Sequence, residues 1–462
     1  MSSKRDTTES VRLGSDGKLH RRFKKVYPNG DIYDCEFSDG KPNGRGIYTS
    51  NEMTYIGGFH RGLFHGDAEV KWTNEENQII KTFEGTYAKG LINGQGEMIW
   101  YQDEQVTKTY NGEFLNNQFH GNGECVIKDQ EVQKGMFVSG KLHCEDGYIR
   151  CDCTGDEYRG PLRFGKKHGV GGNYKYKSGG MYVGEFRFDE MHGLGTRYYV
   201  DGTYFRGGFA NNSINGNGCM VFNNPLDDKE KYVGELVNGI FHGNGTLIFR
   251  KNSKYQNFVG EFKAGLFHKG TLLFRDKSTY DGSFQKGLFE GIGTRTWASG
   301  SYFEGLWKNG MMVEGKYHDS FNNSTYVGSF LRGKKHGRGK ELWKGKEGSS
   351  FFDPIMGWKH EIGTFCKYSG EYENGFCHGK GIFSAPDSRY YEGQWCRNKP
   401  HGQGKMLMMV GSTSSLYRPK VYDGEWTHGV KDGRGTLTFS DGSAKDVTFK
   451  NGHKYGGLKV DS

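Results

Sequence analysis

The sequence has no long apolar run, and this absence excludes membrane-spanning helices. Its longest uninterrupted apolar stretch is MLMMV at 406–410, whereas a spanning helix needs about 20 such residues. The N-terminal MSSKRDTTES lacks the apolar segment of a secretory signal. No glycine follows Met1 and no prenylation cysteine stands at the end of the chain, so no lipid anchor is expected.

Aliphatic residues are also scarce, and the mean hydropathy is −0.79. A core built from Leu, Ile and Val is therefore not expected. In their place stand 75 glycines in 462 residues, which is more than twice the usual share of about 7%, together with 28 Tyr and 32 Phe. Disordered chains are poor in aromatic residues. The combination therefore predicts many short strands joined by tight turns.

Strong charge and regular cysteine spacing are absent as well. The 63 basic and 54 acidic residues leave a net charge of +9, which permits an acidic partner without requiring one. The nine cysteines show no regular spacing, as expected of free thiols in a reducing compartment. These features predict a cytoplasmic protein.

What the chain does contain is one recurring template: aromatic-x-Gly-x-aromatic-x-x-Gly-x-x-His-Gly-x-Gly. Two clear copies are YVGEFRFDEMHGLG at 182–195 and YVGELVNGIFHGNG at 232–245. Their repeat positions are Tyr182, Gly184, Phe186, His192, Gly193 and Gly195, then Tyr232, Gly234, His242, Gly243 and Gly245. Fifteen clear copies start at Tyr33, Tyr55, Phe83, Tyr110, Tyr158, Tyr182, Phe205, Tyr232, Phe258, Tyr280, Phe303, Tyr326, Tyr368, Tyr391 and Tyr422. Worn copies start near Gln133 and Lys445, which makes seventeen, and the commonest step is 23 residues.

Each copy predicts a β-hairpin. Residues at i, i+2 and i+4 of a strand share one face, so Tyr182, Gly184 and Phe186 lie together. The glycine between two rings leaves a slot for a ring from a neighbouring unit. The segment after the closing glycine, such as Thr196–Tyr199, predicts the second strand. Pairs such as Asp201-Gly202 then favour tight hairpin turns between units.

Consecutive hairpins predict an all-β fold: an elongated, single-layer antiparallel meander. Seventeen hairpins supply about 34 strands, and at a spacing of about 4.8 Å they extend roughly 160 Å as a twisted rod. We assign residues 1–26 to a basic tail and lead-in strand, 27–452 to the repeat array and 453–462 to a C-terminal tail. Insertion loops are expected at about 340–367 and 406–421, where the spacing of copies lengthens.

The template resembles the MORN repeat family, named for "membrane occupation and recognition nexus". The resemblance covers nearly the whole chain and implies elongated rods of β-hairpins. It also implies the settings known for the family: membrane contacts, lipid kinases, ciliary radial spokes and cytoskeletal collars. Several copies depart from the template, including Cys35 and Ala68 at glycine positions, and the closing segments of the Gln133, Phe258 and Phe303 units. Such copies are either bends and partner contacts or neutral drift.

No metal, cofactor or catalytic site is expected. Ten of the sixteen histidines share one template position, but units about 10 Å apart cannot bring them to one ion. His143, Cys144, Cys151 and Cys153 offer four soft ligands, yet a Cys-x-Cys spacing suits free thiols as well as zinc. The glycine-rich stretches lack the Ser or Thr of a phosphate loop, and no nucleophile elbow or HExxH occurs.

Basic residues mark the possible contacts with an anionic surface. Lys166 and Lys167 precede the template histidine in one unit, and Lys334 and Lys335 do so in another. They predict either lipid head-group contacts or solvated loop tips. The first 25 residues add eight basic and three acidic side chains, for docking on acidic tails of tubulin, on a membrane, or only for the lead-in strand. Nucleic acid is not expected as a partner, since the basic excess is small and spread out.

Two functions therefore remain open. The first is a non-enzymatic scaffold that bridges or spaces protein partners in a cytoskeletal assembly, with the ciliary or flagellar axoneme as the setting by family analogy. The second is a peripheral tether that binds anionic phospholipids. A small-molecule enzyme is not expected, because a single-layer rod offers no deep pocket.

Overall fold

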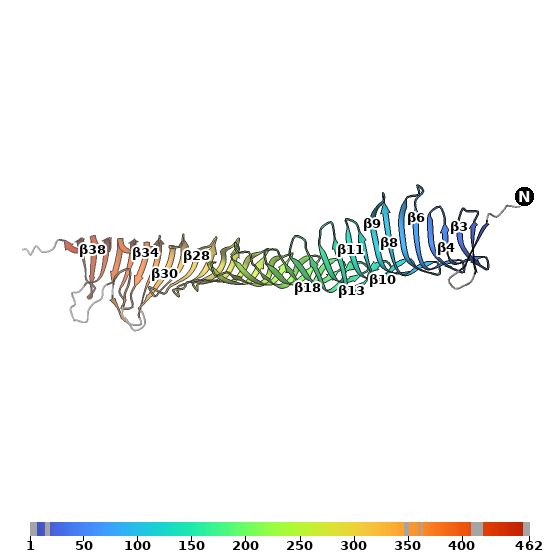
Figure 1. Cartoon of the computed structure of the whole chain (residues 1–462). Helices are drawn as coiled ribbons and strands as arrows, with labels where there is room; N and C mark the ends of the chain where they lie inside the picture. The colour runs from blue at the N-terminus through green and yellow to red at the C-terminus, as the bar shows by residue number, and fades with distance from the viewer. Residues whose placement is uncertain are drawn as a thin grey trace, which may run out of the picture. The chain divides into compact units, whose positions relative to one another are not determined.

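The computed structural model describes residues 7–13, 19–345, 351–357, 359–361, 364–407 and 419–455. Internal contacts divide the chain into two units: unit 1 comprises Met1–Asp227 and Leu236–Gly239, and unit 2 comprises Asp228–Glu235 and Ile240–Ser462. The described residues form antiparallel strands and no helix, which confirms the predicted all-β meander. Figure 1 shows the strands of each unit following one another in chain order.

Twenty strands lie wholly within unit 1. They are β1 Thr7–Leu13, β2 Leu19–Val26, β3 Ile32–Ser38, β4 Lys41–Thr49, β5 Met53–His60, β6 Leu63–Thr73, β7 Ile79–Ala88, β8 Leu91–Gln102, β9 Gln105–Leu115, β10 Gln118–Ile127, β11 Glu131–Val138, β12 Lys141–Leu142, β13 Cys144–Cys151, β14 Glu157–Arg163, β15 Lys166–Lys167, β16 Gly169–Lys175, β17 Met181–Arg187, β18 Glu190–Tyr198, β19 Tyr204–Ala210 and β20 Ser213–Val221. Strand β21, Lys229–Val237, contributes residues to both units.

Nineteen strands lie in unit 2. They are β22 Ile240–Phe249, β23 Tyr255–Lys263, β24 Leu266–Phe274, β25 Thr279–Gln285, β26 Leu288–Thr296, β27 Tyr302–Lys308, β28 Met311–Asp319, β29 Ser324–Leu331, β30 Lys334–Lys344, β31 Phe351–Phe352, β32 Lys359–His360, β33 Phe365–Glu373, β34 Phe376–Ser384, β35 Tyr390–Cys396, β36 Lys399–Leu407, β37 Pro419–Thr427, β38 Val430–Phe439, β39 Ala444–Lys450 and β40 His453–Tyr455. β31 and β32 form a small sheet of their own.

The second strand of a hairpin begins earlier than the sequence predicts. In the copy at 182 it starts at Glu190, directly after the turn, and runs through the closing glycines. Gly184 pairs with Gly195, and Glu185 pairs with His192, so two residues bulge out between them. Gly193 lies in this bulge with a φ of 58°, a conformation that a side chain disfavours. The bulge lets the strand continue past the His-Gly pair.

The paired glycines form a continuous ladder across neighbouring strands. In unit 1, Gly172, Gly184, Gly195, Gly207 and Gly218 pair in succession. In unit 2 the ladder runs through Gly245, Gly260, Gly270, Gly282, Gly293, Gly305, Gly315, Gly328, Gly339, Gly370, Gly381, Gly393, Gly404, Gly424 and Gly435. In these stretches, each strand therefore contributes a residue without a Cβ atom at the same level, and these residues form a continuous line across the sheet.

The ladder explains two units that depart from the template. In the units at Phe258 and Phe303, a glycine stands one residue before the position of the template's final glycine. That glycine, Gly270 or Gly315, pairs with the first glycine of its own unit. Their closing segments are therefore one residue shorter than the template, and the glycine pair between the two strands of the hairpin is retained.

In most units the ring that covers the paired glycines comes from the same unit, which corrects the prediction of a neighbour's ring; at Gly172 the next unit's Phe186 lies closest. A Cβ on Gly195 would lie 2.4 Å from Oη and 2.5 Å from Cε2 of Tyr182. The Tyr182 hydroxyl donates to the carbonyl oxygens of Glu185, at 2.9 Å, and His192, at 3.3 Å. The next unit instead supplies Phe209, whose ring packs edge-on against Tyr182 at 4.9 Å between centroids. We call this side of the sheet the ring face.

Ten template tyrosines repeat the hydroxyl bond, donating to the carbonyl three residues ahead at 2.7–3.1 Å. All ten are nearly inaccessible to solvent. Burial raises the pKa of these phenols, to about 12 for Tyr55, Tyr232 and Tyr280. Where the second ring is a tryptophan, as in Trp307, its indole N–H donates to a ladder glycine carbonyl, here that of Gly293 at 2.9 Å. The core is thus a row of rings on bare backbone.

The terminal and inserted segments lie as follows. The predicted lead-in region forms the hairpin of β1 and β2, and β40 continues the sheet into the predicted C-terminal tail. Residues 1–6, 14–18 and 456–462 lie outside the described part. So do 346–350, 358, 362–363 and 408–418, which belong to the two predicted insertions. The described residues contain no helix long and apolar enough to cross a membrane.

Candidate partner-binding face

A third ring stacks flat on the first template aromatic in many units. It belongs to the residue just before the template histidine: Phe119 stacks on Tyr110 at 3.7 Å, and Phe289 stacks on Tyr280 at 3.7 Å. Rings at this position close the ring face over the tyrosine. The residue found there therefore decides what a partner meets on that face.

Lysine replaces this ring in the two units that carry a basic pair. Lys167 Nζ lies 5.0 Å from the ring centroid of Tyr174 and 4.0 Å from Asp189 Oδ1. Lys335 Nζ lies 5.3 Å from the ring centroid of Tyr326 and forms an ion pair with the buried Glu341. Both ammonium groups therefore face the rings, as cation–π contacts do.

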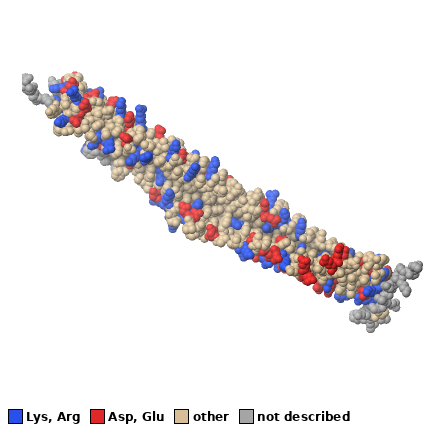
Figure 2. Space-filling model, turned by 90° about the horizontal axis from the view of Figure 1, so that it is seen from above, with Lys and Arg blue, Asp and Glu red and all other residues tan. Residues whose placement is uncertain are grey.

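The neighbouring lysines, Lys166 and Lys334, are exposed, since adjacent residues of a strand point to opposite sides. The structure thus places the two lysines of each predicted pair on opposite sides of the sheet. Lys166 and Lys334 remain available to an anionic surface, whereas Lys167 and Lys335 are held within the ring face. Figure 2 shows basic and acidic side chains mixed over the surface that it draws.

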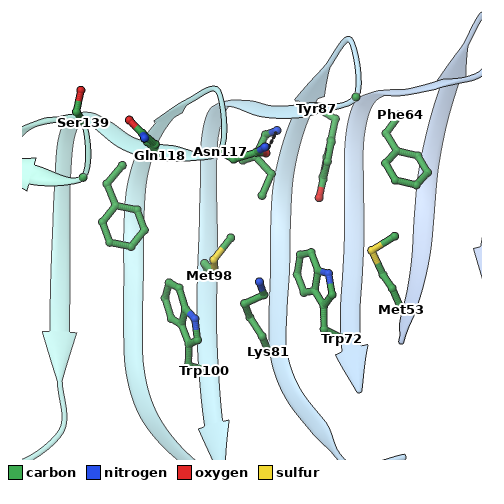
Figure 3. A pocket seen from close by; sticks show the side chains of 14 residues that line it. Met53, Phe64, Trp72, Lys81, Tyr87, Met98, Trp100, Asn117, Gln118 and Ser139 are labelled. Carbon is green, nitrogen blue, oxygen red and sulfur yellow. Dashed lines mark hydrogen bonds between the residues drawn. The ribbon is translucent and has the colours of Figure 1, made fainter. Parts of the chain in front are cut away.

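A groove lies on the ring face of unit 1. It has a volume of ≈ 670 Å³ and is lined by residues of β5, β6, β7, β8 and β10 and of the turns that follow β7, β9 and β11. Figure 3 shows Lys81 lying between Trp72 and Trp100, with Met53 and Met98 nearby. The lining side chains come from four successive template copies, so the groove is a product of stacking.

Strand register builds a row of side chains that begins in this groove and continues beyond it to β9. Trp72 pairs with Lys81, Lys81 with Trp100, and Trp100 with Lys108, across β6, β7, β8 and β9. We call these four residues the Trp–Lys row. Lys81 Nζ lies 4.1 Å from the ring centroid of Trp72, and Lys108 Nζ lies 5.0 Å from that of Trp100. Burial lowers the pKa of Lys81. Within the described part of the chain, neither lysine takes part in an ion pair.

The row offers indole surface and two cations without carboxylates. Half-buried lysines over tryptophan rings keep their charge but lose hydration. A ligand that brings a carboxylate to them and an apolar group to the indoles restores both interactions. The face of the sheet thus has the chemistry to bind an acidic, partly apolar segment of a protein.

The opposite face of the same strands is acidic. Glu84 pairs directly with Glu69 on one side and with Glu97 on the other, and all three are exposed. Like charges placed directly across strands destabilise a sheet. The sequence holds the signal, an acidic residue next to the ladder position in three consecutive strands, but the strand register is needed to bring them together.

We expect Glu84→Lys to stabilise β6–β8 by about 0.5–1 kcal/mol, because it turns two repulsive pairs into attractive ones. Amide hydrogen exchange of these strands measures the change. The matched control is Glu392→Lys, since Glu392 faces Lys405 across β35 and β36, and it should destabilise its strands. Equal effects of the two substitutions, or no loss of the effect in high salt, would contradict the electrostatic cause.

The template histidines contribute backbone and ring contacts. His192 and His242 accept hydrogen bonds from Tyr182 and Tyr232 through their carbonyl oxygens, at 3.3 and 3.4 Å. His168 packs its ring against Phe188 at 4.7 Å. These histidines thus make backbone contacts within their own hairpin or ring contacts with the turn of the next repeat.

A recurring acid next to the ladder escaped the sequence analysis. Glu185 Oε1 accepts the N–H of Leu194 at 3.1 Å and so satisfies the bulge. Glu113 does the same for Asn122, and Gln394 for Gln403. The signal was the acidic or amide residue that repeatedly follows the first template glycine.

The cysteine-rich stretch does not assemble as a metal site. His143 packs against Phe164 at 4.8 Å, Cys144 and Cys151 are half-buried, and Cys153 is exposed. Among the described residues, the group whose potential ligand atoms lie close enough for one ion is a different one, in unit 2.

The MORN repeat model matches thirteen segments: residues 33–51, 55–74, 83–103, 110–132, 182–204, 205–224, 232–254, 280–302, 303–320, 326–345, 368–388, 391–413 and 422–444. Together they cover more than half of the chain. The copies that start near Gln133, Tyr158, Phe258 and Lys445 fall outside these matches, although the structure pairs strands in each of them.

Curated relatives match part of the chain. Alsin of Homo sapiens is 27% identical over 190 residues, which is 38% of this chain and 10% of Alsin. Alsin of Rattus norvegicus is 28% identical over 170 residues, which is 33% of this chain and 10% of that protein. The chain therefore spans about a tenth of the length of these relatives.

Proposed function

The chain belongs to the MORN repeat family, and from this premise we propose that it is a non-enzymatic scaffold whose ring face binds a partner protein. The observation that carries the proposal is the Trp–Lys row, of which Trp72, Lys81 and Trp100 line the groove of unit 1. Its two indoles and two uncompensated ammonium groups fit an acidic, partly apolar polypeptide segment. Repeat proteins commonly bind partners along the surface that their stacking creates.

The setting that we propose is a cytoskeletal assembly, with the ciliary or flagellar axoneme first. This part rests on the known settings of the family and not on the chemistry of the groove. Repetition supports a spacing role, because hairpins of one kind continue along each unit. The mixed charge of the surface also favours protein partners over a lipid surface.

Binding to anionic lipid is the second candidate, and the orientation of the lysines weakens it. Of the four predicted contacts, only Lys166 and Lys334 are exposed. Each basic residue near an anionic membrane contributes about 1 kcal/mol, so two of them give a weak association. Charge reversal at Lys166 and Lys334 should therefore leave localisation unchanged if the scaffold proposal holds.

Extraction of cells with non-ionic detergent tests the proposal. A tagged wild-type chain should stay in the insoluble cytoskeletal fraction, and a Trp72→Ala/Trp100→Ala variant should be released. Tryptophans at the centre of an interface contribute about 2 kcal/mol or more each, so we expect at least a ten-fold fall in the retained fraction. Trp297→Ala is the matched control, since Trp297 is a half-buried tryptophan of unit 2, outside the groove.

The outcomes separate the two candidates. Release of the wild type together with membrane lipids, and loss of that association on charge reversal at Lys166 and Lys334, favours the lipid tether. Retention that survives Trp72→Ala/Trp100→Ala contradicts the groove as the binding site. Complete solubility of the wild type contradicts both functions.

A further inference from the structure

The segment between β30 and β33 carries a buried cluster that no part of the repeat template explains. Its short strands β31 and β32 pair at Phe351 with His360 and at Phe352 with Lys359. Asp353 follows β31, His360 ends β32, and Cys366 lies near the start of β33. The three side chains therefore come from the insertion and from the sheet strand that follows it.

The three side chains meet in the interior. Their potential ligand atoms all lie within 4.8 Å of one another. Asp353 and His360 are each 2% exposed, and Cys366 is fully buried. His360 Nε2 lies 2.9 Å from Asp353 Oδ2. Three polar, ligand-type side chains in so small a buried volume are unusual, because buried polar groups need a specific reason to be there.

The donor set indicates the ligand. We infer that Asp353, His360 and Cys366 bind one Zn²⁺ ion. A carboxylate oxygen, an imidazole nitrogen and a thiolate sulfur are all zinc ligands, at about 2.0–2.3 Å from the metal. Tetrahedral bonds of that length place ligand atoms about 3.3–3.8 Å apart. On binding, His360 Nε2 and Asp353 Oδ2 therefore move apart from 2.9 Å, and any longer separation within the 4.8 Å cluster closes. The thiolate selects against Mg²⁺ and Ca²⁺, which prefer oxygen ligands.

The surroundings of the cluster fit a structural zinc site. Asp353 Oδ1 accepts the backbone N–H groups of Ile355, at 3.1 Å, and of Met356, which leaves Oδ2 directed at His360. Hydrogen bonds of this kind orient a metal-binding carboxylate. Burial, together with the charges of Asp353 and Asp387, raises the pKa of the Cys366 thiol to about 12.

The hairpin of β31 and β32 requires a stabilising interaction beyond its own strand pairing. A two-stranded hairpin is marginally stable in water, and this one has two residue pairs. A metal bound by both the hairpin and β33 would contribute folding free energy directly, as structural zinc sites do. The site would hold the insertion against the sheet of unit 2.

Cobalt(II) alone, added to the full-length metal-free protein, tests the inference. Tetrahedral cobalt with a thiolate ligand gives intense d–d bands and a sulfur-to-metal charge-transfer band. We expect one equivalent to bind, and Zn²⁺ to displace it. Cys366→Ser should abolish the charge-transfer band, and His360→Gln should weaken binding at least ten-fold, in the range seen when a ligand sphere is disturbed.

Two matched variants and one measurement on the wild type keep the test decisive. Cys396→Ser, on the neighbouring β35, and Cys151→Ser/Cys153→Ser, in unit 1, should keep the band. Zinc should also slow amide exchange of 351–361 in the unmodified chain, which needs no variant to fold. Absence of the band in the wild type overturns the inference. So does a band that is lost with Cys151 and Cys153 instead of Cys366, or exchange of 351–361 that zinc does not change.

Discussion

Gly195→Ala is expected to destabilise the hairpin of β17 and β18 by about 3 kcal/mol, at the upper end of the cost of overpacking. The added Cβ would lie within 2.6 Å of three atoms of the Tyr182 ring. That ring cannot move aside, since it is fully buried and held by Phe186 and Phe209. Hydrogen exchange of β17 and β18 measures the local loss, because a long repeat array does not unfold in one step.

The ladder itself provides the control for Gly195→Ala. Ala68 occupies a glycine position and pairs with Gly57 and Gly85, so its unit has already adapted to a methyl group. Ala68→Gly should change stability by less than about 1 kcal/mol.

A double-mutant cycle then isolates the steric cause. In a Tyr182→Ala background, Gly195→Ala should cost far less than in the wild type, since the ring that it strikes is absent. Additive effects of the two substitutions would contradict the ring-on-glycine explanation.

Lys335→Phe is expected to destabilise unit 2 by about 3 kcal/mol, even though phenylalanine is the usual residue at this template position. Glu341 is 3% exposed and depends on the ion pair with Lys335. It also accepts hydrogen bonds from Ser324 and Tyr372, both at 3.2 Å. Removing one partner of a buried ion pair leaves the other charge uncompensated.

In another repeat of the chain, apolar residues occupy the positions of this ion pair, and that repeat supplies the control. In the unit at Phe258 the corresponding residues are Phe267, Leu272 and Phe284, whose side chains pack together. Lys335→Phe/Glu341→Leu/Tyr372→Phe copies them and should be close to neutral or stabilising, as replacement of buried ion pairs often is.

Denaturant unfolding of the two variants should therefore differ, with the single substitution less stable than the triple. A single variant as stable as the wild type would show that Glu341 does not need its cation. A triple variant as unstable as the single one would show that this unit cannot adopt the apolar packing.

Much of the fold followed from the template. The alternation of Tyr182, Gly184 and Phe186 identified the first strand and its buried side, and the recurrence of the motif identified the meander. The second strand is predicted to begin after the closing glycine, whereas in the structure it begins at Glu190 and runs through His-Gly-x-Gly. It is a strand with a bulge, and only the pairing of Gly184 with Gly195 shows this.

The functional residues were less accessible to sequence reasoning. The sequence does not distinguish Lys334 from Lys335, because the contacts of each side chain depend on the strands beside it and not on its position in the chain. Trp72, Lys81, Trp100 and Lys108 stand 9, 19 and 8 residues apart, so no spacing marks them as a row. Asp353, His360 and Cys366 lie in an insertion without a periodic pattern, where strand alternation gives no guide.

The sequence by itself determined the repeating hairpin, the antiparallel meander and the ring-and-glycine core, because these depend on local alternation and turn chemistry that recur in every unit. Only the tertiary structure decided which residues meet across strands: the ladder of paired glycines, the Trp–Lys row, the facing glutamates and the buried cluster at Cys366. The physical reason is register. If one strand slides by a single residue along its neighbour, every residue faces a different partner, although the repeat pattern within each strand stays the same.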